Sequence, residues 1–127
     1  MTARLSIDHV TKTYQQGSDI TTALRDATLH VNQGEFVAIV GPSGSGKTTL
    51  LAIAGALLQP TEGEVSIDGQ SLAGLSARQQ AELRLAKIGF VLQSSNLVPF
   101  LRARDQLQLV AYLAGHANAA AAQRADR

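Results

Sequence analysis

The residues with the clearest chemical meaning lie in one short segment, Gly41–Thr49, which reads Gly-Pro-Ser-Gly-Ser-Gly-Lys-Thr-Thr. The part from Gly41 to Thr48 fits the pattern G-x-x-x-x-G-K-[ST]. Glycines let the backbone of such a loop turn successive N–H groups into one concavity, and a helix that begins behind it adds partial positive charge. The alternative is a Gly/Ser-rich turn between a strand and a helix. The Gly-Lys-Thr at the right offset favours a phosphate-binding loop.

Each residue type in this loop has an expected role. The Lys47 ammonium would reach the β- and γ-phosphoryl oxygens of a nucleotide, which makes Lys47 a candidate catalytic as well as binding residue. The Thr48 hydroxyl would bind Mg²⁺, and the Thr49 hydroxyl would donate a hydrogen bond to the α-phosphate. The other candidate binding residues form the cradle itself: Gly41, Pro42, Ser43, Gly44, Ser45 and Gly46.

The segments on both sides of the loop are the elements that must position it. Phe36–Val40 is apolar without alternation, which predicts a parallel strand buried on both faces. After the loop, apolar residues recur at helical spacing up to Leu58, and we expect Pro60–Gly63 to end that helix. Ile88–Leu92 predicts a second buried strand, which Gln93 closes.

The rest of the chain predicts an antiparallel portion and further helices. Apolar and polar residues alternate in two early segments, around Leu5–Val10 and Leu24–Val31, as in a sheet with one solvent-exposed face. Glu64–Ile67 predicts a strand that enters a tight turn.

Two later helices have local signals. Ser76 followed by Gln79 predicts a capping box at the start of a helix that runs to about Ala86. After Pro99, one predicted helix face carries Leu107, Val110, Ala111 and Ala114.

Composition excludes several classes of protein. The 127 residues carry 11 Lys and Arg against 10 Asp and Glu, a net charge of +1, so a bulk basic surface for nucleic acid is ruled out. There is no cysteine, which excludes disulfides and thiolate zinc sites and favours a cytosolic face. The longest apolar run, Leu50–Leu58, is about half the roughly 18 residues that a membrane-spanning helix needs. The three histidines have no metal-ligand spacing and are expected on the surface.

The ordered set of motifs resembles the N-terminal part of the ATP-binding subunits of ABC transporters. The loop alone fits many families, so the resemblance depends on the whole series: Val10–Tyr14, Gly34–Phe36, the loop, Pro60–Val65 and Ile88–Gln93. Asn96–Leu101 is similar to the branch that serves lipoprotein release and macrolide export.

The resemblance implies an α/β fold of the P-loop NTPase class. It would be an ABC-type nucleotide-binding domain, truncated, with an N-terminal antiparallel β portion. Residues 1–93 would hold the β portion and the loop core, and residues 94–127 the start of the helical subdomain.

By the same resemblance, Tyr14 stacks on adenine, and Gln93 contacts Mg²⁺ or the attacking water and links the site to a transmembrane partner. An ordinary strand-end tyrosine and a loop-capping glutamine are the alternatives. The implied cofactors are ATP and Mg²⁺. The implied partners are a permease and a second ATP-binding subunit, on the cytoplasmic side of the cell membrane and peripheral to it.

Some features of the family are missing or altered. Leu92 stands where Phe is common, and Arg102 where a Thr often caps the next helix, which should weaken that helix start. After Gln93 there is no Leu-Ser-Gly-Gly-Gln-type signature, no acidic strand and no switch histidine, and Leu75–Gln79 lacks the glycines of a signature.

We therefore expect ATP binding with little or no hydrolysis, because a homodimer of this chain would leave both sites half built. The ending looks cut, and the isolated chain should be marginally stable or prone to associate. The rival readings are a short non-catalytic regulatory module that binds nucleotide, a non-functional truncated product and, least favoured, another P-loop enzyme such as a kinase.

Overall fold

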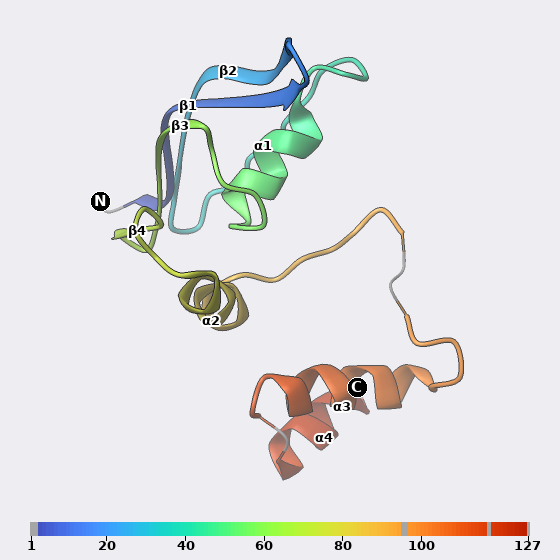
Figure 1. Cartoon of the computed structure of the whole chain (residues 1–127). Helices are drawn as coiled ribbons and strands as arrows, with labels where there is room; N and C mark the ends of the chain where they lie inside the picture. Colours follow the sequence, from blue (N-terminus) through green and yellow to red (C-terminus); the bar gives the residue numbers. More distant parts are fainter. Residues whose placement is uncertain (1–2, 95–96, 117, 127) are drawn as a thin grey trace. The chain divides into compact units, whose positions relative to one another are not determined.

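The computed structural model describes residues 3–94, 97–116 and 118–126, which form two compact units. Unit 1 is Met1–Ile88 and unit 2 is Gly89–Arg127, and each is described by itself. Unit 1 contains β1 (Ala3–Gln16), β2 (Asp19–Asn32), α1 (Lys47–Ala54), β3 (Glu62–Ile67), β4 (Gln70–Ser71) and α2 (Ala77–Lys87) (Figure 1). Unit 2 contains α3 (Ala103–Leu113) and α4 (Ala119–Ala125).

The sheet of unit 1 has the strand order β2-β1-β3-β4, and all its pairs are antiparallel. The long β1–β2 hairpin turns at Gln16–Asp19, and β1 also pairs with β3 through Leu5↔Ile67 and Ile7↔Val65. The predicted N-terminal antiparallel portion is confirmed, and so is the predicted strand that runs into a turn at Asp68.

The core of unit 1 lies between the sheet and the end of α1. Ile7, Val10 and Ile53 are completely buried, and five further apolar side chains join them in one cluster: Ala56, Val65, Ile67, Leu72 and Leu83. In Figure 1, α1 runs along one side of the β1–β2 hairpin. Burial of each large aliphatic side chain contributes about 1.5–3 kcal/mol, so this cluster holds α1 and α2 against the sheet.

Helix α2 begins as the sequence predicts. The Ser76 hydroxyl accepts a hydrogen bond from the Gln79 backbone N–H at 3.2 Å, and the Ser76 N–H donates to the Gln79 side chain at 2.9 Å. This reciprocal capping box satisfies two donors that a helix start leaves without partners. The contrast with α3 is also as expected, since Arg102 at its start makes no capping hydrogen bond.

Helices α3 and α4 form a hairpin within unit 2. The Asn118 side chain caps α4 by accepting a hydrogen bond from the Ala121 N–H at 2.9 Å. The predicted apolar face of α3 is only partly covered, because Leu107 and Val110 remain more than half exposed. No residue in the described part of α3 is buried.

Two predicted strands are wrong. Phe36–Val40 and Ile88–Leu92 lie outside regular structure, with Phe36 95% and Val40 87% exposed. A doubly buried parallel strand requires hydrogen-bonded neighbours on the same sheet and layers on both faces. The described strands form only an antiparallel sheet, so neither segment has such a neighbour in the part of the chain that the structure describes.

The predicted extent of the first helix is also wrong. Helix α1 ends at Ala54, and Ala56 has a left-handed backbone with φ of 55°, so the chain turns before Leu58. The N–H groups of Leu57 and Leu58 both donate to the Ala52 carbonyl, which closes the turn after the helix. The segment around Pro60 therefore enters β3 and does not end the helix.

Asp68 connects three elements of unit 1. Its carboxylate accepts a hydrogen bond from the Arg4 guanidinium at 2.6 Å and lies 3.0 Å from the Lys87 ammonium, and its N–H donates to the Arg4 carbonyl. These contacts join β1, the β3–β4 turn and the end of α2. The hydrogen bonds from Arg4 and then Lys87 lower the pKa of Asp68 below its usual 3.8.

Asp68→Asn should remove a stabilisation that depends on pH. Because the pKa of Asp68 is lower in the folded state, its ion pairs stabilise the fold above the unfolded-state pKa and are lost as the pH falls through the folded-state pKa. The difference in urea midpoint between the wild type and the variant should be largest near neutral pH and should shrink below about pH 4. Asp19→Asn is the matched control, since Asp19 forms no ion pair within the described ranges. A difference that does not change with pH would contradict this role.

The exposed apolar segment predicts self-association. Phe36 and Val40, shortly before the loop in the sequence, are two large apolar side chains left exposed, and exposed apolar surface drives association. Sedimentation velocity should show species that grow with concentration, and the double variant F36S/V40S should reduce them. Ile20→Ser, which changes an exposed side chain beside the turn of the hairpin, should not. A monomer at every concentration would overturn the prediction.

Candidate phosphate-binding site

The loop Gly41–Gly46 has the backbone conformation that its glycines predict. Gly44 and Gly46 have φ of 80° and 91°, values that residues with a Cβ rarely adopt. The Ser45 N–H donates to the Pro42 carbonyl at 3.2 Å, which closes a tight turn inside the loop. The loop therefore curls back on itself before α1 begins.

Gly46 is packed directly against β2. A Cβ at Gly46 would lie 2.6 Å from the Ala23 carbonyl oxygen and 3.5 Å from the Leu24 side chain. Only glycine fits between the loop and this strand. The contact fixes where α1 starts relative to the hairpin.

The first turn of α1 presents free donors beside the loop. The first intrahelical hydrogen bond runs from the Leu50 N–H to the Gly46 carbonyl at 2.9 Å, which leaves the N–H groups of Lys47, Thr48 and Thr49 outside the helix ladder. There is no acidic residue in that turn. Such a helix start attracts an anion.

The Lys47 side chain folds over the loop backbone. Its ammonium donates to the carbonyls of Gly41 and Pro42, the second at 2.8 Å, and lies 3.4 Å from the Ser45 hydroxyl. Within the described residues Lys47 forms no ion pair, so its charge is not neutralised by a carboxylate. The charge therefore lies against the backbone of the loop, directly before α1.

The two threonines that follow complete the site. The side chain of Thr48 is exposed and that of Thr49 is half-buried, and neither hydroxyl makes a hydrogen bond in the described structure. A free hydroxyl next to a phosphate cradle suits a hard cation such as Mg²⁺, which prefers oxygen ligands. The residues present therefore fit a magnesium–phosphate ligand.

The β1–β2 hairpin brings Tyr14 toward the same place. Tyr14 pairs with Thr21, only two positions before Ala23, whose carbonyl faces Gly46. Its side chain is 44% exposed, and the Lys12 ammonium lies 5.2 Å from the centre of its ring. Sequence reasoning missed both Ala23, whose contribution is a backbone atom, and Lys12, whose only signal is its spacing two residues before Tyr14.

Gln93 belongs to unit 2 and is exposed there. Its predicted contact with the loop joins the two units and stays a prediction. Asn96, part of the segment that resembles one transporter branch, lies outside the described residues.

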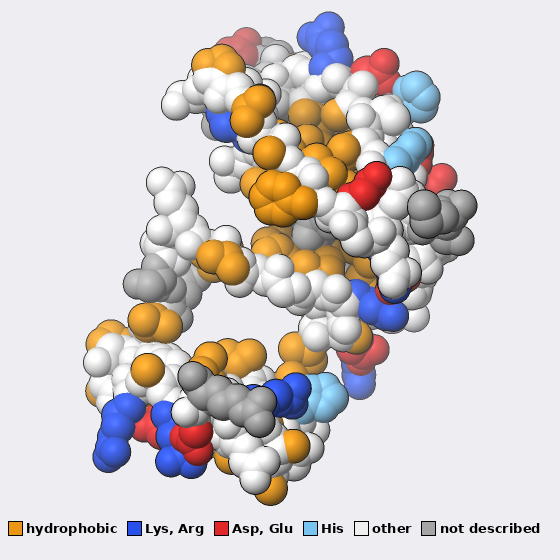
Figure 2. Space-filling model, turned by 180° about the vertical axis from the view of Figure 1, so that it is seen from behind, with side chains coloured by type: hydrophobic (Ala, Val, Ile, Leu, Met, Phe, Trp, Pro, Cys, Tyr) orange, Lys and Arg blue, Asp and Glu red, His pale blue; other side chains and the backbone are white. Residues whose placement is uncertain are grey.

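Histidines and carboxylates pair on the hairpin. His9 lies 2.8 Å from Asp26, and His30 lies 2.7 Å from Asp8. Hydrogen bonds from the Ser6 hydroxyl and then the His30 ring lower the pKa of Asp8. Figure 2 shows histidine side chains beside carboxylates on the surface. Among the described residues no group of three or more such side chains could hold a metal ion, and the two pairs are exposed hydrogen-bonded contacts.

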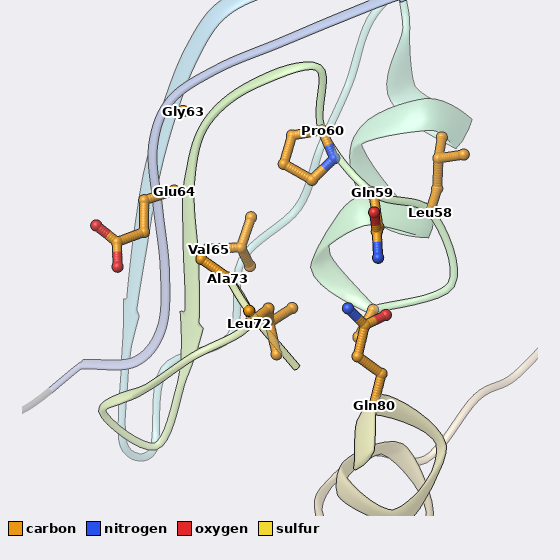
Figure 3. A pocket seen from close by; sticks show the side chains of 11 residues that line it. Leu58, Gln59, Pro60, Gly63, Glu64, Val65, Leu72, Ala73 and Gln80 are labelled. Carbon is orange, nitrogen blue, oxygen red and sulfur yellow. The ribbon is translucent and has the colours of Figure 1, made fainter. Parts of the chain in front are cut away.

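A separate cavity lies between the end of α1, β3 and α2, away from the loop. It has a volume of about 180 Å³, and its apolar lining includes Leu58, Val65 and Leu72. The Gln80 amide points into it from α2 (Figure 3). Gln80 is only 8% exposed and its side chain makes no hydrogen bond in the described structure. None of the predicted site residues lines this cavity.

The loop geometry and the sequence together define the family. The sequence profile of the ABC transporter family matches residues 24–127, which include the whole loop and α1. The chain belongs to the ABC transporter family, in its ATP-binding domain.

Several ABC transporter ATP-binding proteins are similar to this chain. An uncharacterized ABC transporter ATP-binding protein of Methanocaldococcus jannaschii, MJ0796, is 47% identical over 83% of this chain and 45% of its own. The putative hemin import ATP-binding protein HrtA of Staphylococcus haemolyticus is 45% identical over 97% of this chain and 55% of its own. The lipoprotein-releasing system ATP-binding protein LolD 1 of Rhodospirillum rubrum is 44% identical over 89% of this chain and 50% of its own.

Solved structures agree with the family and the fold. The dimeric post-hydrolysis state of the cassette MJ0796, bound to ADP and Pi, superposes with a TM-score of 0.84 at 40% identity, over 95% of this chain and 53% of that one. The predicted class, a P-loop ABC domain, is confirmed. The chain spans about half the length of the relatives it matches. None of the helices in the described ranges is long and apolar enough to cross a membrane.

Gly46→Ala should damage unit 1 more than Gly44→Ala. Both positions have a positive φ, but a Cβ at Gly44 meets nothing within 4 Å, whereas at Gly46 it meets the Ala23 carbonyl. We expect Gly44→Ala to cost about 1–2 kcal/mol of unfolding free energy from backbone strain, and Gly46→Ala about 1–3 kcal/mol more. Urea unfolding followed by circular dichroism measures both. Equal losses would show that the contact with β2 adds nothing.

Proposed function

We propose that this chain is the ATP-binding part of an ABC transporter ATPase and that it binds Mg-ATP at the loop Gly41–Thr49. The observation that carries the proposal is the cradle formed by the loop, the free N–H groups of the first α1 turn and the Lys47 ammonium. The relative MJ0796 in its dimeric structure is bound to ADP and Pi, which supports the same ligand class here.

Lys47, Thr48 and Thr49 would each bind a different part of Mg-ATP. Lys47 would exchange its backbone carbonyl partners for the β- and γ-phosphoryl oxygens, which are stronger acceptors because they are charged. Thr48 would supply an oxygen ligand to Mg²⁺, and Thr49 would donate to the α-phosphate. Mg²⁺ supplies charge neutralisation on the phosphates when it is bound.

Two further residues extend the site. Tyr14 would offer its exposed ring to the adenine, since stacking needs only a planar partner and no reading of base edges. Gln93 would reach Mg²⁺ or the attacking water from unit 2. Residues 1–93 would form the β portion and loop core, and residues 94–127 the start of a helical subdomain.

ATP hydrolysis requires protein groups that phosphate binding does not. Orienting a water molecule and completing the charge around the transferred phosphoryl group require further groups on the other side of the nucleotide. The 127 residues carry no signature sequence, no acidic strand and no switch histidine after Gln93. We infer that this chain alone binds nucleotide with little or no turnover.

The proposed partners follow from the family. The chain would work with a transmembrane permease and a second ATP-binding subunit, at the cytoplasmic face of the membrane. The relatives named for hemin import and for lipoprotein release support a transport role, and neither fixes a substrate for this chain.

Binding is tested with Lys47→Ala. The variant loses a charge-assisted interaction with the phosphates, so the affinity for Mg-ATP should fall about tenfold or more in equilibrium titration. Arg78→Ala is the control: it removes the same charge from an exposed ion pair on α2, and the affinity should not change.

Turnover is measured in parallel as phosphate release. The wild type should release no more phosphate than Lys47→Ala does. Sustained turnover that Lys47→Ala abolishes would disprove the binding-only part of the proposal, and a wild type that does not bind Mg-ATP would disprove it entirely.

A further inference from the structure

Lys12 and Tyr14 form a contact that phosphate binding does not explain. The Lys12 ammonium lies 5.2 Å from the centre of the Tyr14 ring, inside the distance of about 6 Å at which a cation is attracted to an aromatic face. The two residues are two positions apart on β1, so their side chains lie on the same side of the strand. The β1–β2 register shifts on both sides of Lys12, and such irregularities bend a strand and re-aim its side chains.

The contact occupies one face of the tyrosine ring and leaves the side chain partly open to solvent. An aromatic ring has two faces, each with negative electrostatic potential. The ammonium covers one of them, while 44% of the Tyr14 surface stays open to solvent. A cation on the covered face draws electron density toward itself, so the open face repels the π-electrons of a stacked base less.

We infer that Lys12 is a positioning residue for the base: it holds the Tyr14 ring and prepares its open face for the purine of a bound nucleotide. The inference rests on the proposed function, because it needs a nucleotide in the Gly41–Thr49 loop. Lys12 is free for this task, since it forms no ion pair with any described carboxylate.

A simpler role for Lys12 makes a different prediction. Lys12 pairs with Leu24, the neighbour of Ala23, whose carbonyl faces Gly46. A positive charge there would also attract phosphate through space. That attraction would act on any phosphate ligand, with or without a base. The two roles are therefore separated by comparing ligands that share their phosphates and differ in the base.

The experiment titrates the 127-residue chain with ADP and with inorganic pyrophosphate, each with Mg²⁺, by calorimetry. ADP avoids turnover, and pyrophosphate lacks the adenosine. Lys12→Met keeps the aliphatic stem and removes the charge, so it should weaken ADP binding about two- to fivefold and leave pyrophosphate binding unchanged. Lys12→Arg keeps a cation over the ring and should retain the ADP affinity. In a Tyr14→Leu background, Lys12→Met should have no effect on ADP.

The other outcomes overturn the inference in distinguishable ways. If Lys12→Met weakens the binding of ADP and of pyrophosphate equally, Lys12 acts on the phosphates and the proposed function still stands. If Lys12→Met leaves ADP binding unchanged or tightens it, the ammonium does not help the base. If the wild type binds neither ligand, the proposed function fails and the inference fails with it.

Discussion

The close approach of Gly46 to the Ala23 carbonyl is the constraint on which the rest of the site depends. The loop can present N–H groups only if α1 starts at a fixed place, and α1 starts where Gly46 touches β2. The same strand pairs with β1 at Tyr14. One backbone contact therefore relates the loop to the exposed aromatic ring, although Gly46 and Tyr14 are 32 positions apart in the sequence.

The sequence correctly predicted the features that depend on residues close together in the chain. The capping box of Ser76 and Gln79 involves neighbours three positions apart, and both of its hydrogen bonds are present. The loop conformation follows from its glycines, and the antiparallel strands follow from alternation and turns. Features that depend on distant pairing were not readable. Neither the β1–β2 register nor the fit of Gly46 against Ala23 has a signal in the spacing of residues.

The two wrong strands show why. An apolar run such as Phe36–Val40 indicates which side chains the segment would bury. Whether the segment forms a parallel strand depends on the other strands of the sheet. With no parallel neighbour among the described strands, the run lies outside regular structure and is mostly exposed. The prediction for the end of α1 is wrong for a different reason. Ala56 takes a left-handed backbone that its residue type does not suggest.

The site also separates affinity from catalysis in physical terms. In the proposed site, the free N–H groups, the Lys47 ammonium and the Thr48 hydroxyl would all act from one side of the nucleotide, and together they would stabilise charge that is present before any reaction. Catalysis depends on charge that develops only in the transition state and on a water molecule in line with the bond that breaks. Groups that bind the ground state and the transition state equally well raise affinity without raising the rate. A cradle of this kind is therefore a binding device first, and its rate depends on what faces it across the nucleotide.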